Sequence, residues 1–167
     1  MKTQEMAQPV KSPTSFIDAD YFLKHWQGHR RVTRRVIEAF PEDKLFTYSI
    51  GGMRPFASLV LEMIGMAVPG VQGVSTGKWS TFEDADVPAS KEELLKLWDA
   101  ATTDIDSVWP TIMPNRFQEV EVAFGQYEGP NYETLLYFID NEIHHRGQGY
   151  VYLRSLGIEP PAFWDRS

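Results

Sequence analysis

Apolar residues recur at helical spacing in four stretches of the chain, whereas strand-like alternation is confined to residues 117–124. The pattern predicts helices over residues 18–40, 55–68, 90–112 and 131–156. The third is the most regular, because its apolar residues keep a period of about 3.6 residues without interruption. Four amphipathic helices that each bury one face predict an all-α protein built as a four-helix bundle.

Local sequence signals indicate where the helices begin and end. Ser90 and Glu93 form a capping box, in which a hydroxyl and a carboxylate each satisfy a free backbone N–H. Pro55 suits the first position of a helix, where its missing N–H costs nothing. We expect Asn131 to cap the last helix and Gly157 to end it in a left-handed conformation.

The connections between the helices differ in length. About 14 residues join the first two helices, and about 20 residues, numbered 69–89, join the second and third. Gly70 and Gly73 are interpreted as part of that loop. An up-and-down bundle needs only short turns, so the longer link predicts a crossover between helices 2 and 3. Residues 1–16 are polar and are expected to form a flexible N-terminal arm, which leaves residues 17–167 as a single domain.

Composition narrows the classes of function. The chain has 167 residues, of which 43% are hydrophobic and none is cysteine. The lack of cysteine excludes a disulfide scaffold, an iron–sulfur cluster and a cysteine nucleophile. A formal net charge of −7 argues against nucleic-acid binding, which depends on basic side chains. The basic run at residues 30–35 is therefore interpreted as a solvated helix face.

The sequence also argues against a membrane protein. The most apolar stretch, residues 59–68, is too short to span a bilayer and contains Glu62. Residues 1–10 lack the apolar core of an export signal. We therefore expect a soluble, cytoplasmic protein.

Two positions interrupt the apolar rows of the helices. Glu62 lies in the same row as Leu59 and Met66, which we expect in the core. A carboxylate in such a place must be paired, bind a cation or take up a proton. In the last helix Asn141 and His145 lie four residues apart and hence on one face, and two side chains at that spacing can converge on one metal ion.

These residues also have a purely structural interpretation. Glu62 can serve as the salt-bridge partner of His145 or Arg146. A second histidine pair with the same spacing, His25 and His29, lies in the first helix, but no carboxylate nearby completes a cluster. The residues alone leave the metal site and the structural pair both open.

Several runs of residues resemble a known family. Residues 144–148 (HHRGQ), 152–157 (YLRSLG) and 160–161 (PP) resemble the C-terminal signature of the DinB/YfiT-like superfamily. Residues 53–56 (MRPF) resemble its second-helix segment. The helix order and the long crossover agree, so the resemblance covers the chain from about residue 16 to about residue 162.

The resemblance implies a four-helix bundle, often a homodimer, that holds a divalent metal ion such as zinc or nickel by three histidines. Members of known activity include thiol-dependent enzymes that use bacillithiol, mycothiol or glutathione. The family name records induction by DNA damage in some members. The resemblance thus implies a small-molecule substrate and a low-molecular-weight thiol as partners, with no nucleic acid and no membrane.

Carried over onto this chain, the three ligand positions fall on Glu62, Asn141 and His145, which the resemblance implies as metal ligands. Only the histidine is retained. Glu62 suits zinc, since mixtures of histidine and carboxylate bind it well. The neutral amide of Asn141 is a poorer match for zinc or nickel. Glu142, one position along, would reach the site only if the helix rotated.

Two hypotheses follow. In the first, the protein is a metal-dependent transferase or hydrolase, in which the metal binds a low-molecular-weight thiol as its thiolate. His144 or Arg146 would then hold an anionic group of the substrate. In the second, the bundle has lost its metal and acts as a binding or stress-response protein without catalysis, with Glu62 and His145 as a structural pair.

Overall fold

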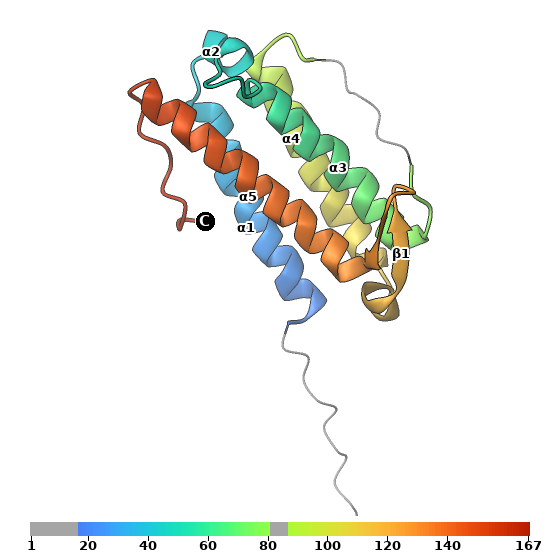
Figure 1. Ribbon diagram of the computed structural model, residues 1–167. Coiled ribbons are helices and arrows are strands. Elements are labelled where there is room, and N and C mark those ends of the chain that lie inside the picture. Colours follow the sequence, from blue (N-terminus) through green and yellow to red (C-terminus); the bar gives the residue numbers. More distant parts are fainter. Residues whose placement is uncertain (1–16, 81–86) are drawn as a thin grey trace, which may run out of the picture.

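The computed structural model describes residues 17–80 and 87–167, and Figure 1 shows its long helices packed side by side. These helices are α1 (Ala19–Ala39), α3 (Phe56–Thr76), α4 (Lys91–Val108) and α5 (Asn131–Ser155). Both α1 and α3 pack against α4 and against α5, so α1 and α3 occupy opposite corners of the bundle. The predicted all-α bundle is confirmed. The arm expected at residues 1–16 lies outside the described residues.

Short elements complete the described fold. They are α2 (Glu42–Thr47), the 3-10 helices η1 (Trp109–Thr111) and η2 (Pro114–Gln118), and the strands β1 (Val120–Ala123) and β2 (Tyr127–Pro130). The strands pair antiparallel, with Val120 opposite Pro130. This hairpin lies at the end of the bundle where α5 begins (Figure 1). The alternation at residues 117–124 therefore corresponds in part to β1.

The caps at the start of α4 and the end of α5 follow the predictions. Oγ of Ser90 accepts a hydrogen bond of 3.1 Å from the N–H of Glu93, and the Glu93 carboxylate accepts one of 2.8 Å from the N–H of Ala89. Gly157 follows α5 with a φ of 76°, a left-handed conformation that glycine adopts without strain. Local chemistry suffices to place both ends.

Asn131 does not cap α5, contrary to the prediction. Pro130 holds the cap position without a side-chain hydrogen bond, and Asn131 is the first helical residue. The Asn131 side chain is fully buried and donates a hydrogen bond of 2.9 Å to the backbone carbonyl of Arg116. It therefore joins η2 to α5 instead of satisfying the end of its own helix.

Two further boundaries differ from the sequence pattern. The third helix, predicted to reach residue 112, ends at Val108 and continues as η1, because Pro110 has no N–H for a further α-helical hydrogen bond. The first connection contains α2, which starts after Pro41 and buries Leu45. A helix of this length is too short to show an amphipathic period.

The prediction that the second helix stops before Pro69 is wrong, because α3 continues to Thr76. A proline inside a helix removes one backbone hydrogen bond, and here tertiary packing outweighs that loss. Gly70, which was expected in a loop, is buried in the helix against the ring of Phe138, and a Cβ at this position would overlap that ring. The missing side chain thus permits close contact between α3 and α5.

The connection that follows α3 is shorter than predicted. Gly73 also belongs to the helix, and Gly77, with a φ of 72°, ends it in a left-handed conformation. The link to α4 therefore comprises residues 77–90 instead of 69–89. Residues 81–86 of this link lie outside the described part of the chain.

Helix α3 is the most apolar element of the bundle. Its length and a mean hydropathy of 1.4 over 18 residues would allow it to cross a membrane on composition alone, but 50% of that window is buried inside the fold. The core on either side of it contains buried aromatic side chains from all four long helices, from η1 and from the C-cap of α1: Trp26, Phe40, Phe56, Trp98, Trp109, Phe138 and Tyr152. Helix α3 thus forms part of the core, and its composition alone is weak evidence for a membrane span.

Candidate functional site

Glu62 on α3 faces Asn141 and His145 on α5, so the three predicted residues meet where these helices pack together. Nε2 of His145 lies 3.0 Å from Oε1 of Glu62, and the amide of Asn141 donates a hydrogen bond of 3.3 Å to the same oxygen. Asn141 and His145 are buried, whereas the Glu62 side chain is 24% exposed. The interruptions in the two apolar rows therefore belong to one polar contact.

The contact that Nδ1 of His145 makes determines whether Nε2 of the neutral ring carries a hydrogen. Nδ1 lies 2.8 Å from Oε1 of Gln148, while the amide nitrogen of Gln148 donates to Sδ of Met53 at 3.4 Å. Because an amide oxygen only accepts, Nδ1 carries a hydrogen and donates it. A neutral ring then presents the lone pair of Nε2 to the Glu62 carboxylate. Two facing lone pairs require a positive charge between them, either a proton on the ring or a metal ion.

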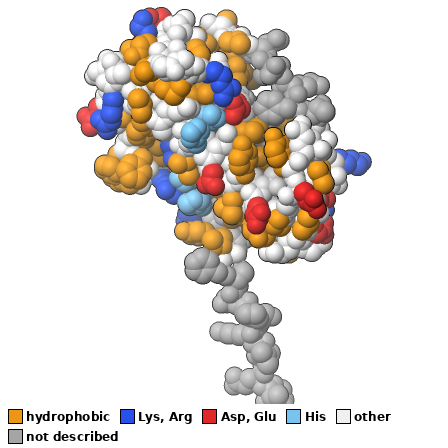
Figure 2. Space-filling view, in the orientation of Figure 1, with side chains coloured by type: hydrophobic (Ala, Val, Ile, Leu, Met, Phe, Trp, Pro, Cys, Tyr) orange, Lys and Arg blue, Asp and Glu red, His pale blue; other side chains and the backbone are white. Residues whose placement is uncertain are grey.

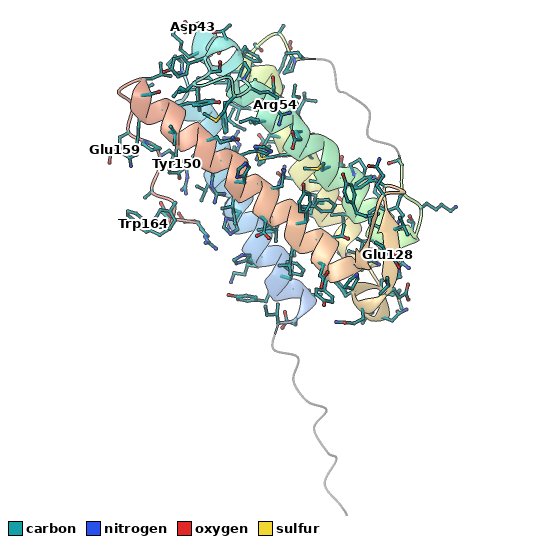
Figure 3. All side chains as sticks on the ribbon, viewed as in Figure 1. Asp43, Arg54, Glu128, Tyr150, Glu159 and Trp164 are labelled. Carbon is teal, nitrogen blue, oxygen red and sulfur yellow. The ribbon has the colours of Figure 1, made fainter. Side chains whose placement is uncertain are left out.

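A guanidinium group from outside the helix pair also binds Glu62. Arg54 lies just ahead of α3 (Figure 3), and its Nη2 donates to Oε2 of Glu62, the oxygen that His145 does not use. The backbone carbonyl of Arg54 accepts a hydrogen bond of 2.9 Å from the hydroxyl of Tyr152, which fixes the Arg54 backbone against α5.

The charge state of Glu62 follows from these contacts. Burial raises the pKa of its carboxyl group, but hydrogen bonds from Arg54, His145 and Asn141 together outweigh burial and lower that pKa below its ordinary value. The carboxylate is therefore ionised in neutral solution, as a metal ligand or an ion-pair partner needs to be.

The donor atoms suit a small divalent cation. Nδ2 of Asn141 faces Glu62, and Oδ1 is buried without a hydrogen-bond partner, so a half-turn of the amide would present an acceptor oxygen to the site. With Nε2 of His145 and the Glu62 carboxylate it provides one nitrogen and two oxygen ligand groups, of which zinc favours the imidazole and the carboxylate and the neutral amide is the weakest ligand. The distance of 3.0 Å between the Glu62 and His145 atoms agrees with about 2.9–3.4 Å for two ligands that each lie about 2.0–2.1 Å from one ion.

An amide is required to complete this ligand set. Among the described residues, no group of three His, Cys, Asp or Glu side chains lies close enough to hold a metal ion. Glu62 and His145 supply two groups, and Asn141 is the remaining polar side chain of the predicted three.

The side of α5 that faces α1 carries a second polar cluster. Glu142 is 2% exposed, and guanidinium nitrogens of Arg30 and Arg146 each lie 3.8 Å from its carboxylate. Thr33 donates to Glu142 at 2.6 Å and Trp26 donates at 3.2 Å. Burial raises the pKa of Glu142, although the nearby arginines oppose the shift. Glu142 is therefore engaged with α1 and does not reach the site between α3 and α5.

Two basic residues, Arg30 and Arg146, are buried, whereas Arg31 in the same basic run is exposed and Arg34 and Arg35 are partly exposed. Arg30, in the run interpreted as a solvated face, is 1% exposed, and its guanidinium lies 3.9 Å from the centre of the Trp98 ring. Its position four residues after buried Trp26 was a sequence signal for this burial. Arg146, one of the two residues expected to hold a substrate anion, is 5% exposed and turns toward α1, whereas the other, His144, is exposed. Neither of the two buried arginines is free to bind a ligand at Glu62.

The alternative histidine pair also comes together, in surroundings that disfavour a metal ion. Nε2 of His25 and Nε2 of His29 lie 3.3 Å apart. Arg146 donates to Nδ1 of His29 at 3.0 Å, and Arg166 lies 3.4 Å from Nδ1 of His25. Burial, followed by the charges of Arg146, Arg166 and His25, lowers the pKa of His29 to about 3. Two guanidinium groups beside the rings would repel a bound cation.

Arg54 is the site residue that the sequence reasoning missed. Its run, residues 53–56, was noted only for a resemblance, and no periodic pattern indicates that an arginine ahead of a helix turns back onto Glu62. A chemical signal was available, because a half-buried carboxylate needs a cationic partner. Arg54 lies just before the start of the helix that carries Glu62 and is a basic residue close enough to pair with it.

The surface around these groups is mixed in character. Figure 2 shows histidine side chains reaching one face in two places, each among charged and apolar side chains. A separate hollow of about 760 Å³ lies between the start of α1, η2 and the start of α5, and its lining includes Tyr21, His25 and Phe117. Glu62, Asn141 and His145 are not part of this lining.

The fold and the site together define a class: a four-helix bundle with a carboxylate, an amide and an imidazole brought together by its second and fourth long helices in chain order. The sequence profile of the DinB family matches residues 6–166. The chain therefore belongs to the DinB family.

Comparisons with individual proteins agree with this assignment. The chain is 23% identical over 156 residues to the uncharacterized protein YrdA of Bacillus subtilis (strain 168), with 89% of each sequence covered. The crystal structure of the DinB-like protein YjoA of Bacillus subtilis is similar with a TM-score of 0.72 and 21% identity, covering 87% of this chain and 99% of that one. A DinB-like protein from Bacillus cereus ATCC 10987 gives 0.70 and 19%, covering 86% and 95%.

A more distant structure has the same fold. A histidine-to-alanine variant of the mycothiol-dependent maleylpyruvate isomerase is similar with a TM-score of 0.63 and 13% identity, covering 84% of this chain and 68% of that one. At these identities the structural likenesses establish the fold that the chains share.

Proposed function

We propose that this DinB-family protein binds a divalent metal ion, zinc or nickel, through Glu62, Asn141 and His145. The observation that carries the proposal is the contact of 3.0 Å between Nε2 of His145 and Oε1 of Glu62, in which Gln148 already uses the other ring nitrogen. The unpartnered, buried Oδ1 of Asn141 supports it, because a half-turn of the amide, whose nitrogen faces Glu62, would let a metal ion satisfy that oxygen.

We propose further that the protein is a metal-dependent transferase or hydrolase that uses a low-molecular-weight thiol. A bound divalent metal would lower the pKa of a thiol co-substrate and keep it nucleophilic at neutral pH. Gln148 orients the His145 ring, and Tyr152 holds the Arg54 backbone beside Glu62. The chain has no cysteine, so the sulfur must come from a co-substrate. The name of the mycothiol-dependent isomerase supports the idea that this fold accommodates thiol chemistry.

Metal analysis tests the first part of this proposal. Untagged protein is purified without chelators, reloaded with zinc or nickel, desalted and assayed for metal by mass spectrometry. We expect close to one equivalent in the wild type and less than about a tenth in Glu62→Gln and in His145→Ala. Glu121→Gln is the matched control, because Glu121 is also a half-buried carboxylate and pairs with Arg116 at 2.9 Å. Wild-type protein that stays below a tenth of an equivalent after reloading would contradict metal binding.

A second candidate function is favoured by the ion pair with Arg54. In a metal-free bundle, Arg54 and a protonated His145 would neutralise Glu62, and the protein would serve as a binding or stress-response protein without catalysis. In that case Glu62→Gln and His145→Ala lower the melting temperature, while added zinc leaves the melting temperature of the wild type unchanged. A rise in the wild-type melting temperature with zinc that both variants lose decides for the metal.

We also propose that the protein works in the cytoplasm as a homodimer. The absence of cysteine supports the location, because disulfides are rare in the reducing cytoplasm. Exposed apolar side chains on α5, among them Leu136, Tyr137 and Val151, support self-association. Light scattering of the purified protein tests the dimer, and a monomer mass at all concentrations would contradict it.

A further inference from the structure

The hollow between the start of α1, η2 and the start of α5 has the size of a small-molecule site. Its volume of about 760 Å³ falls in the range of about 300–1,000 Å³ that is usual for ligand pockets. Three separate elements contribute its walls, and Glu62, Asn141 and His145 are not among its lining residues. A molecule bound here would therefore occupy a site distinct from the proposed metal site.

The walls of the hollow are apolar, and part of them is held in place by the core. The rings of Phe22 on α1 and Phe117 on η2 both pack against Trp109, with ring centroids 5.6 Å and 5.8 Å apart. Tyr21 and Leu136 also line the hollow and are exposed to solvent. A ligand with an apolar body would cover these side chains, and the removal of that surface from water would stabilise the complex.

The lining also contains a carboxylate. Among the residues that the structure describes, Asp18 is the one lining residue that is charged in neutral solution, because burial and then the charge of Arg166 lower the pKa of His25 and leave its ring neutral. One oxygen of Asp18 caps α1 by accepting a hydrogen bond of 2.7 Å from the N–H of Tyr21. A carboxylate has further acceptor capacity, so Asp18 is a positioned anion that can accept from a bound molecule as well.

The charges give the hollow a direction. His25 lies seven residues after Asp18, which corresponds to about 10 Å along the helix axis. A guanidinium nitrogen of Arg166 lies 3.4 Å from Nδ1 of His25, so a positive charge adjoins that end of the hollow. A cationic group is therefore attracted to the end at Asp18 and repelled from the end at His25.

We propose that the hollow binds an amphiphilic amine, with the ammonium group beside Asp18 and the apolar body against Phe22, Phe117 and Leu136. Tyr21 adds a ring to the lining, and the faces of such rings attract cations. The formal net charge of −7 favours the approach of a cation over that of an anion. The site is independent of the proposed metal, so metal-free protein suffices for its test.

Isothermal titration calorimetry of the full-length protein tests the charge preference. The probes share one apolar body and differ in the head group: 4-phenylbutylamine, 4-phenylbutan-1-ol and 5-phenylpentanoate. Asp18→Asn removes the charge and keeps the helix cap, because asparagine caps a helix about as well as aspartate. The control is Asp20→Asn, which removes an equal charge from the first turn of α1 at a residue outside the lining.

In the wild type we expect the amine to bind about three- to fivefold more tightly than the alcohol, as one partly exposed ion pair allows, and the acid to bind least. In Asp18→Asn the amine and the alcohol should bind equally, whereas Asp20→Asn should keep the preference. The same ratio of dissociation constants in the wild type and in Asp18→Asn would overturn the role of Asp18 and with it the proposed ligand class.

Two tryptophan signals locate the bound amine. The indole N–H of Trp109 donates a hydrogen bond of 3.1 Å to the carbonyl of Ala19, which lines the hollow, whereas that of Trp98 donates to the carbonyl of Arg30 at 3.3 Å. In proton–nitrogen correlation spectra the amine should shift the Trp109 signal and leave the Trp98 signal in place. A shift confined to Trp98 would place the ligand elsewhere and contradict the proposal.

Leu136→Gln tests the apolar wall. Leu136 is 44% exposed, so the fold tolerates a polar side chain there, and the variant should bind all three probes at least about threefold more weakly. Failure of the wild type to bind the amine at millimolar concentration would overturn the proposal. If light scattering then shows that Leu136→Gln converts a dimer into a monomer, the hollow is an interface between two copies of the chain instead.

Discussion

Arg146 on α5 donates a hydrogen bond of 3.0 Å to Nδ1 of His29 on α1, so the imidazole of this buried histidine acts as an acceptor. An arginine side chain has only donors, which requires a lone pair at Nδ1 and hence a neutral ring. Burial and the nearby charges of Arg146, Arg166 and His25 lower the pKa of His29 to about 3.

This contact predicts loss of stability in mild acid. The unfolded chain takes up a proton on His29 as the pH falls through 6.5, whereas the folded protein does not do so until about pH 3. Between these values the free energy of unfolding falls with decreasing pH, at a slope that approaches about 1.4 kcal/mol per pH unit. We expect this histidine to account for a loss of about 1 kcal/mol between pH 6 and pH 5, measured by urea unfolding.

His29→Asn isolates the contribution of this residue, because the amide oxygen accepts from Arg146 but does not titrate. His25, whose pKa is also lowered, and Glu142, whose raised pKa acts in the opposite direction, remain in both proteins. The variant should show the shallower decline toward acid. Equal declines in the two proteins would refute the assignment to His29.

Gly70→Ala is expected to destabilise the protein by about 1–3 kcal/mol, because the added Cβ would overlap the ring of Phe138 and push α3 away from α5. Gly147→Ala is the control: Gly147 is exposed on α5, a Cβ added there would meet no atom within 4 Å, and alanine should stabilise the helix by about 0.5–1 kcal/mol. Thermal unfolding of both variants measures the two effects. A stabilising Gly70→Ala would show that the helices are not held this closely.

Glu142→Gln should destabilise the protein by about 3 kcal/mol, since it leaves the guanidinium groups of Arg30 and Arg146 buried without a counter-charge. The comparison is Glu38→Gln, which removes a half-exposed partner of Arg34 and should cost less than about 1 kcal/mol. Chemical denaturation of the two variants gives the difference. Similar costs at the two positions would mean that the buried cluster does not depend on the negative charge.

Tyr152→Phe is expected to cost about 1 kcal/mol, because the hydroxyl of this fully buried side chain donates to the carbonyl of Arg54 at 2.9 Å. Tyr48→Phe serves as the comparison, since its hydroxyl contacts Ser155 at the surface at 2.9 Å and water can replace that contact. Hydrogen exchange of the backbone amides around residue 54 should quicken in the first variant alone. Unchanged exchange there would contradict the anchoring role of Tyr152.

Helix ends were predictable where the chemistry is local. Ser90 and Gly157 act within one turn of backbone, and the sequence contains everything that their capping requires. The continuation of α3 through Pro69 was not predictable in this way, because it depends on the packing of Gly70 against a side chain far along the chain. Intrinsic preference at a proline is outweighed only by contacts that exist once the bundle has formed.

The candidate site was predictable to the extent that it breaks a pattern. Glu62, Asn141 and His145 stood out as polar residues in apolar rows, and the structure brings them together. Arg54 lies before the start of α3 and therefore interrupts no row of apolar residues. Its contact with Glu62 could not be predicted from the periodic pattern for this reason. The burial of Arg30 could have been predicted from its position four residues after Trp26. The other basic residues of the run favoured an exposed face instead.

The two polar faces of α5 have separate tasks. The side chains of Asn141 and His145 contact Glu62 on α3. Those of Glu142 and Arg146 contact α1 and fix the rotation of α5 about its own axis. The orientation of the helix therefore does not depend on which residues occupy positions 141 and 145. Substitutions at positions 141 and 145 can therefore alter the polar contact with Glu62 while the contacts of Glu142 and Arg146 with α1 keep the scaffold in place.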